Sequence, residues 1–234
     1  DCVKTGKPAI PAGAHLGGDP ARTRRFVLGM HSRALAMAPA LLPALDMKGC
    51  SRLLDVASGP GTFSGQLAER YLNLEVTLFD LPPVLEVAKE LVAGRICAPR
   101  IRFIPGDYHT DALPSGYDSV LYAGALHQET PEQATALFRA MLDNMEPGGK
   151  IFVVDMMLQP DRTAPAFAIL FSINMMLTSA AGRVFAEDEV RGLLSQAGFE
   201  NTECNRLQEC PYWIVTARKP PLSRLPPQGR QEHR

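Results

Sequence analysis

Short β-rich runs alternate with helical patterns along most of the chain, and this alternation constrains the fold more than any other feature. The β-rich runs are 52–57, 74–80, 100–107, 117–124 and 150–158. Helical patterns lie between them near 62–71, 82–93 and 131–145. Parallel strands need long crossover connections, which these helical segments supply. The alternation therefore predicts an α/β protein with a doubly wound parallel sheet.

The last two β-rich runs are too close together to be parallel. Residues 199–208 and 212–219 are separated only by 209–211. A gap of this length permits a hairpin but not a crossover. The sheet is therefore predicted to end with an antiparallel strand.

Composition excludes several classes of function. The chain has 234 residues, a formal net charge of −1 and 46% hydrophobic residues, as expected for an ordinary globular protein. It has no basic stripe interleaved with aromatics and no apolar run long enough to cross a bilayer, so neither nucleic-acid nor membrane binding is expected. The five cysteines show no C-x-x-C spacing, so we expect reduced thiols, no metal site and a cytoplasmic location.

Local composition suggests four segments. Residues 1–20 are rich in Gly, Pro and Ala and are expected to form a flexible lead-in, while the proline-rich tail 220–234 is expected to be disordered. Residues 21–50 have helical spacing interrupted by prolines and are expected to be a helical connector remaining from an N-terminal region. The chain begins with Asp rather than Met, which suggests a piece of a longer polypeptide. Residues 51–219 are the predicted ligand-binding domain.

The run "LLDVASGPGTFSG" at 53–65 passes from a predicted buried strand through a glycine turn into a helix. Open α/β sheets bind ligands at the carboxyl ends of their strands. A P-loop is excluded because no Gly-Lys-Ser/Thr follows the glycines. The dinucleotide fingerprint requires its third glycine at position 64, which is Ser64, so a nicotinamide dehydrogenase is the disfavoured alternative.

The remaining polar and glycine residues fit a nucleoside that carries no pyrophosphate. Gly59 and Gly61 would let the backbone approach the ligand, with Asp55 nearby. Asp80 closes the next predicted strand and could accept both ribose hydroxyls. The helix beginning near Thr62 would offer its first N–H groups to a carboxylate. S-adenosylmethionine has an adenosine, a ribose diol and a carboxylate, and is the predicted cofactor.

Several motifs, taken in order, resemble the small-molecule O-methyltransferases, a family that includes acetylserotonin O-methyltransferase and the plant caffeate and flavonoid enzymes. They are "LLDVASGPGTFS", "VTLFDLPPVLEVAK", "RFIPGDYHTDALPSGYDSVLYAGALHQ", "MEPGGKIFVVDMML", "SINMML" and "LLSQAGF". The resemblance covers roughly 22–218 and is strongest to acetylserotonin O-methyltransferase-like proteins. It implies a Rossmann-like, class I S-adenosylmethionine-dependent methyltransferase fold, with seven strands and strand seven antiparallel between strands five and six.

The resemblance also implies a reaction and a base. The reaction is methyl transfer to a hydroxyl of a small aromatic or indolic acceptor, and the full-length protein would form a homodimer. His127 matches the family's general base, a role that suits imidazole because its pKa is ordinarily about 6.5. Asp155 matches an acidic residue that flanks the base and could orient its imidazole.

Further residues match binding positions of the family. Asp107 and Tyr108 match positions that line the adenine. Asn174 matches a substrate-contacting asparagine, and Met30, in a stretch that lines the cofactor, is assigned to substrate binding with it. Methionines at 156, 157, 175 and 176 could wall an aromatic acceptor or simply fill the core.

The chain departs from the family pattern around the base. A second flanking glutamate of the family is Val184 here, a following Asp is Gln128, and a basic cofactor-contacting residue is Gly124. The family's three-glycine run reads Ala57-Ser58-Gly59. Two hypotheses therefore stand: a working O-methyltransferase, or a cofactor-binding protein that has lost most catalysis and serves interaction or regulation.

Overall fold

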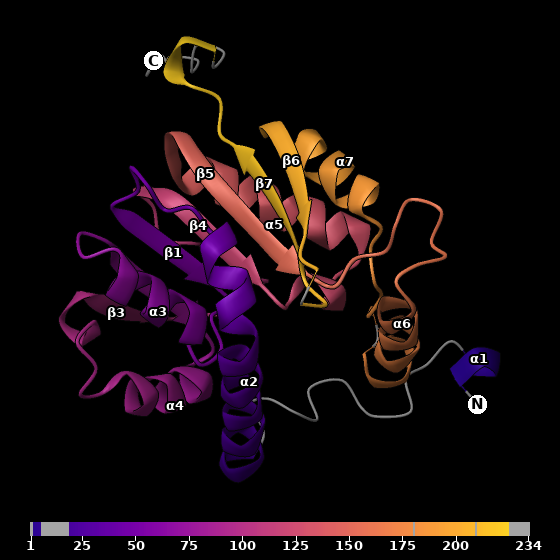
Figure 1. Ribbon diagram of the computed structural model, residues 1–234, viewed down its shortest axis with the longest axis horizontal. Helices are drawn as coiled ribbons and strands as arrows, with labels where there is room; N and C mark the ends of the chain where they lie inside the picture. Colours follow the sequence, from indigo (N-terminus) through magenta and orange to yellow (C-terminus); the bar gives the residue numbers. More distant parts are fainter. Residues whose placement is uncertain (1, 6–18, 180, 209, 225–234) are drawn as a thin grey trace, which may run out of the picture.

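The computed structural model describes residues 2–5, 19–179, 181–208 and 210–224, which form a seven-stranded sheet with helices on both faces (Figure 1). The strands are β1 (Arg52–Val56), β2 (Glu75–Asp80), β3 (Ile101–Pro105), β4 (Tyr117–Ala123), β5 (Met145–Asp155), β6 (Glu200–Arg206) and β7 (Trp213–Arg218). Their order is β3-β2-β1-β4-β5-β7-β6. β1 to β5 pair in parallel, whereas β7 is antiparallel to both β5 and β6. The predicted sheet and the position of its antiparallel strand are confirmed.

The helices form two layers, with α1 and α6 outside them (Figure 1). The α-helices are α1 (Cys2–Thr5), α2 (Pro20–Leu41), α3 (Thr62–Arg70), α4 (Pro82–Val92), α5 (Pro131–Asn144), α6 (Ala166–Thr178) and α7 (Glu187–Ala197). Short 3₁₀ turns are η1 (Leu42–Ala44), η2 (Ala98–Arg100), η3 (Leu126–Gln128) and η4 (Leu222–Arg224). α2, α3 and α4 cover one face of the sheet and α5 and α7 the other, while α6 stands beside the carboxyl ends of the strands.

Each face of the sheet has its own apolar core because successive strand side chains point to opposite faces. Leu53 and Leu121 pack toward α3 and α4, and both are fully buried. Leu54 and Val56 pack with the residues of α5 and α7. Strands buried on both faces explain why the runs read as nearly continuous apolar segments in the sequence.

The predicted connector is a single long helix followed by a turn. Asp19 caps α2 by accepting hydrogen bonds from the N–H groups of Ala21 and Arg22. The sequence allowed one or two helices here because of Pro39 and Pro43, and the structure has one, which continues through Pro39 to Leu41. Pro39 has no N–H to donate to the carbonyl four residues earlier, and the last turn is held by the buried Ala38 and Leu41.

The expectations for the two ends of the chain fall mostly outside the described residues. Within the predicted lead-in, the described part comprises α1 and the start of α2. Within the predicted tail, it comprises residues 220–224, which include η4.

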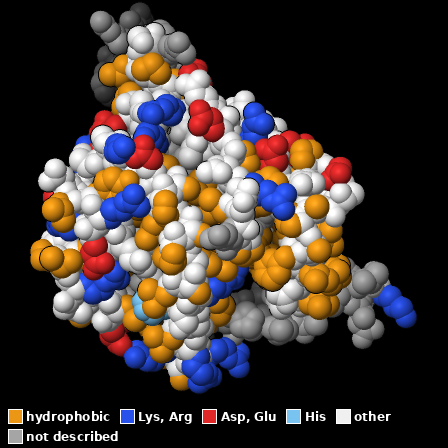
Figure 2. All heavy atoms as spheres, viewed as in Figure 1, with side chains coloured by type: hydrophobic (Ala, Val, Ile, Leu, Met, Phe, Trp, Pro, Cys, Tyr) orange, Lys and Arg blue, Asp and Glu red, His pale blue; other side chains and the backbone are white. Residues whose placement is uncertain are grey.

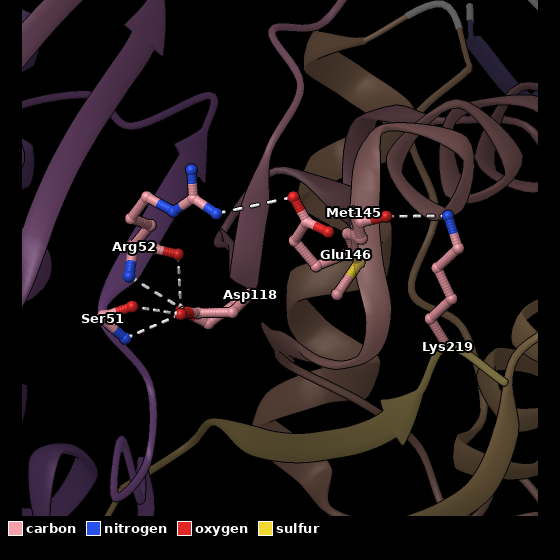
Figure 3. Close-up of polar contacts among 7 residues, drawn as sticks. Ser51, Arg52, Asp118, Met145, Glu146 and Lys219 are labelled. Carbon is pink, nitrogen blue, oxygen red and sulfur yellow. Dashed lines mark hydrogen bonds and ion pairs between the residues drawn. The ribbon is translucent and has the colours of Figure 1, made fainter. Parts of the chain in front are cut away.

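Polar contacts tie the strands together at the edge where β1, β4 and β5 begin (Figure 3). The Asp118 carboxylate accepts hydrogen bonds from the backbone N–H and the hydroxyl of Ser51, at 2.8 and 2.6 Å, and from the N–H of Arg52 at 3.1 Å. The ammonium of Lys219, just after β7, donates to the carbonyl of Met145 at 2.7 Å. These contacts hold the strand starts together, and the opposite edge carries the predicted site.

The turn that follows β1 uses left-handed backbone conformations. Ala57, Gly59 and Gly61 have φ values of 55°, 54° and 65°. A Cβ on Gly61 would lie 2.4 Å from Cδ1 of Leu78, which is fully buried, whereas one on Gly59 would meet nothing within 4 Å. Gly61 is therefore required by packing against β2, and only Gly59 faces open space.

We expect alanine to be more costly at Gly61 than at Gly59. Both substitutions place a Cβ on a left-handed backbone, which costs about 1–2 kcal/mol, and only the first also overpacks Leu78, at about 1–3 kcal/mol more. Urea unfolding of Gly61→Ala and Gly59→Ala measures the difference. Equal losses would contradict the packing argument.

Candidate functional site

The parallel strands bring the predicted site residues to one edge of the sheet. Asp80 and Asp155 are the last residues of β2 and β5, and Asp107 follows β3. His127 lies in η3, which follows β4. Because parallel strands end at the same edge, these residues come to one edge of the sheet although they are far apart in the sequence.

Asp80 is an acceptor held at the glycine turn. Its two oxygens accept the backbone N–H groups of Gly59 and Leu81, each at 2.7 Å. Burial raises the pKa of Asp80 to about 6, against the lowering effect of these two bonds, and the charge of Asp107 raises it further. Each oxygen retains capacity to accept a second hydrogen bond.

Asp55 lies behind the turn rather than at its surface. It is buried and accepts a hydrogen bond from the Ser64 hydroxyl at 2.5 Å. Burial raises its pKa to about 7, and the charge of Asp80 acts in the same direction. Asp55 therefore links β1 to α3 through this hydrogen bond and stabilises the turn between them.

The loop after β3 is fastened to a residue that the sequence reasoning missed. The Tyr108 hydroxyl donates to Oε1 of Glu129 at 2.8 Å, and burial raises the pKa of both groups. Asp107 accepts the N–H of His109 at 2.9 Å. Glu129 is buried, and its other oxygen has no hydrogen-bond partner among the described residues. Its place two residues after His127 was the signal available in the sequence.

His127 and Asp155 form a buried pair. Nδ1 of His127 lies 3.0 Å from each oxygen of Asp155, whose carboxylate also accepts the N–H of His127 at 3.1 Å and that of Met156 at 2.7 Å. The Phe171 ring of α6 meets the imidazole edge-on at 4.9 Å. This arrangement keeps the proton on Nδ1 and leaves Nε2 as the acceptor.

The segment after α6 lies beside this pair without a second carboxylate at position 184. The N–H of Arg183 donates to the His127 carbonyl at 2.9 Å. Val184 is buried with Leu158, Ala168 and Ala186 in a small apolar cluster. The side chain at position 184 therefore packs under α6 and makes no polar contribution to the imidazole.

The methionines and the substrate candidates divide between core and surface. Met156 and Met157 are fully buried in the two cores, so neither walls an open site. Asn174 is exposed on α6, and Met30 is half-buried on α2. α6 also exposes a group of apolar side chains, visible at the right of Figure 2: Phe167, Leu170, Ile173, Met176 and Leu177.

The groups around the glycine turn fit the predicted cofactor. No side chain caps α3, so its first N–H groups remain available for a carboxylate. The Ser58 hydroxyl is buried without a hydrogen-bond partner among the described residues. Together with the Asp80 carboxylate, these groups supply donors for an amino-acid carboxylate and acceptors for ribose hydroxyls.

The described part of the chain contains no group of three or more His, Cys, Asp or Glu residues placed to hold a metal ion. None of its helices combines the length and apolar character needed to cross a membrane.

A seven-stranded sheet with an antiparallel seventh strand, and a site built from its carboxyl edge, define the Rossmann-like class of S-adenosylmethionine-dependent methyltransferases. Residues 9–200 match the family of O-methyltransferase domains. The chain belongs to this family.

Named relatives agree with the family and differ in chemistry. The tetracenomycin polyketide synthesis 8-O-methyl transferase TcmO of Streptomyces glaucescens is 30% identical over 94% of this chain and 65% of its own length. Acetylserotonin O-methyltransferase of Gallus gallus is 30% identical over 83% of this chain and 55% of its own length. An L-tyrosine C(3)-methyltransferase of Streptomyces lavendulae is 30% identical over 83% of this chain and 53% of its own length.

A solved structure shows the same fold. Human N-acetylserotonin methyltransferase, crystallised in complex with S-adenosylmethionine, superimposes with a TM-score of 0.84 at 25% identity, over 94% of this chain and 65% of that chain. This chain therefore spans between about half and just under two thirds of the lengths of these relatives.

The buried Asp55 should make stability depend on pH. Its folded-state pKa of about 7 lies above the unfolded value, so its contribution to the free energy of unfolding is largest below about pH 4 and is lost as the pH rises through 7. Asp55→Asn keeps an acceptor for Ser64 and cannot ionise. We expect its stability relative to the parent protein to rise by about 1–3 kcal/mol between pH 4 and pH 8.

Urea unfolding at pH 4, 6 and 8 measures this change. Asp143→Asn, on the exposed face of α5, is the matched control and should show no such rise. The same pH dependence in both variants would rule out burial of Asp55 as the cause.

Proposed function

We propose that this protein transfers a methyl group from S-adenosylmethionine to a hydroxyl of a small aromatic or indolic acceptor, with His127 as general base. The buried His127–Asp155 pair is the observation that carries the proposal. A carboxylate bonded to Nδ1 orients the imidazole and stabilises its protonated form. Membership of the O-methyltransferase domain family supports the reaction class.

The chain's own residues would divide the work as follows. Gly59 and Asp80 would hold the ribose, while Asp107 and Tyr108 would line the adenine. When bound, the cofactor supplies a methyl group on a positively charged sulfur. Nε2 of His127 would take the proton of the acceptor hydroxyl as its oxygen bonds to the methyl carbon, while the bond from that carbon to sulfur would break and leave a neutral thioether. The exposed Asn174 and the half-buried Met30 remain the candidates for contacting the acceptor.

The acceptor is proposed to be aromatic because the surroundings of the base are apolar. Phe171 packs edge-on against His127, and α6 presents a further apolar surface next to it. Relatives named for polyketide and acetylserotonin methylation act on ring-bearing acceptors. Positioning such a ring beside the base is worth about 7–11 kcal/mol in well-oriented reactions.

A second candidate is a cofactor-binding protein with little or no methyl transfer. Val184 is the observation that favours it, because its apolar cluster leaves His127 with one carboxylate instead of two. The cofactor side of the site lacks the family's basic residue at Gly124, but the acceptors of Asp80 and the open N-terminus of α3 are intact. We therefore expect measurable binding of S-adenosylmethionine. We expect methylation of N-acetylserotonin to be weak or absent.

Substitutions in the pair should separate catalysis from binding. We expect His127→Ala to lower kcat by about 10²–10⁴-fold and Asp155→Asn by up to about 10⁴-fold. Both should keep their affinity for S-adenosylhomocysteine, because neither residue is placed at the adenosine. A panel of aromatic hydroxyls with labelled cofactor measures transfer, and calorimetry measures binding.

Gln128→Ala is the control, since this neighbour is exposed. Rapid turnover that survives in His127→Ala would contradict the role of the base. Absence of turnover in the parent protein, with cofactor binding intact, would favour the second candidate. Recovery of turnover in Val184→Glu would attribute that loss to the missing carboxylate.

A further inference from the structure

Arg33 of α2 is a half-buried cation with no carboxylate within ion-pair distance among the described residues. Its guanidinium carbon lies 5.3 Å from the centre of the Tyr212 ring, and Nη2 lies 3.9 Å from the sulfur of Met156. A ring face and a thioether steady the group but do not neutralise its charge. Partial burial of an unpaired charge is unfavourable, so such a group is suited to bind an anion.

The position of α2 places this cation over the carboxyl edge of the sheet. Two residues earlier, Nδ1 of His31 lies 2.7 Å from the hydroxyl of Thr62, the first residue of α3. α3 follows β1, whereas the partners of Arg33 follow β5 and precede β7. Since β4 lies between β1 and β5 in the sheet, α2 passes over the end of β4 between these two contacts.

The end of β4 offers no charge of its own. The residue there is Gly124, with a φ of 72°. A Cβ at this position would lie 3.4 Å from the hydroxyl oxygen of Tyr212, so the tyrosine limits the size of the side chain that fits here. The positive charge at this edge therefore comes from the helix above and not from the strand.

Other basic groups near the site are already engaged or uncharged. Arg95 is paired with Glu69 at 2.9 Å, and Arg183 with Glu189 at 2.9 Å. Burial lowers the pKa of His31, with a further contribution from the charge of Arg95, so its imidazole is neutral at pH 7. Among these groups, Arg33 is the one with its charge available.

We propose that Arg33 binds the carboxylate at the amino-acid end of the cofactor, opposite the open N-terminus of α3 and the unpartnered hydroxyl of Ser58. A guanidinium offers paired donors that match a carboxylate. The inference rests on the cofactor part of the proposed function and not on methyl transfer, so an inactive protein that binds cofactor leaves it intact.

The test compares two ligands that differ by the carboxylate alone. Calorimetry is carried out with S-adenosylmethionine and with decarboxylated S-adenosylmethionine on the parent protein and on Arg33→Met, which keeps the apolar contact with Tyr212. We expect the substitution to weaken binding of S-adenosylmethionine about tenfold or more, equivalent to about 1.4 kcal/mol. Binding of the decarboxylated ligand, which is more positive, should stay the same or improve.

Two further variants serve as controls. Arg33→Lys keeps the charge and should retain part of the affinity. Arg206→Met removes another guanidinium that lies 5.3 Å from a ring, that of Trp213, on the distant strand β6, and should leave both affinities unchanged.

Each outcome decides the matter. Equal weakening for both ligands in Arg33→Met would mean that the residue only fixes α2 on the sheet, and would overturn the proposal while leaving the cofactor assignment in place. No weakening for either ligand would overturn it as well. Failure of the parent protein to bind S-adenosylmethionine would overturn both this inference and the proposed function.

Discussion

Parallel pairing of β1 to β5 is the constraint on which the rest of the structure depends. It buries both faces of these strands under helices, so the strand interiors must be apolar. Polar groups can then be accommodated only where the strands end. The same pairing aligns those ends, so Asp80, His127 and Asp155 come to one edge of the sheet although they are far apart in the sequence. Chemistry at one edge is thus a consequence of the way the core is built.

The edge is divided electrostatically into two halves. Asp55 and Asp80 lie on the side of β1 and β2, where burial favours their neutral forms and hydrogen bonds from Ser64 and from backbone N–H groups favour the charged ones. On the side of β4 and β5, Nδ1–H of His127 donates a hydrogen bond to the buried carboxylate of Asp155. Buried carboxylates are tolerable only with such partners. The acidic half suits a nucleoside, the histidine half suits proton removal, and α2 with Arg33 passes above them.

Helix α6 and the segment that follows it join the acceptor side to the sheet. The Phe171 ring packs edge-on against the imidazole of His127, and the N–H of Arg183 donates a hydrogen bond to the carbonyl of His127. The carboxylate of Glu189, on α7, accepts hydrogen bonds from the side chain of Arg183 and from the N–H of Ala186. These bonds fix the segment at its far end. The residue between these anchors, Val184, is committed to an apolar cluster.

The sequence by itself determined the strands, their helical connections and the antiparallel last strand, because strand alternation and a short hairpin gap are local signals. Asp80 was predicted from its place at a strand end, whereas His127 and Asp155 were predicted from the family resemblance. The sequence left open the reason for Gly61, which is the methyl of Leu78 on another strand, and whether the helix continues through Pro39. It also missed Glu129 and the unpaired Arg33, since burial and the absence of a partner are properties of packing. Only the tertiary structure decides which charges meet, because hydrogen bonds and desolvation depend on distances between segments that the sequence does not place.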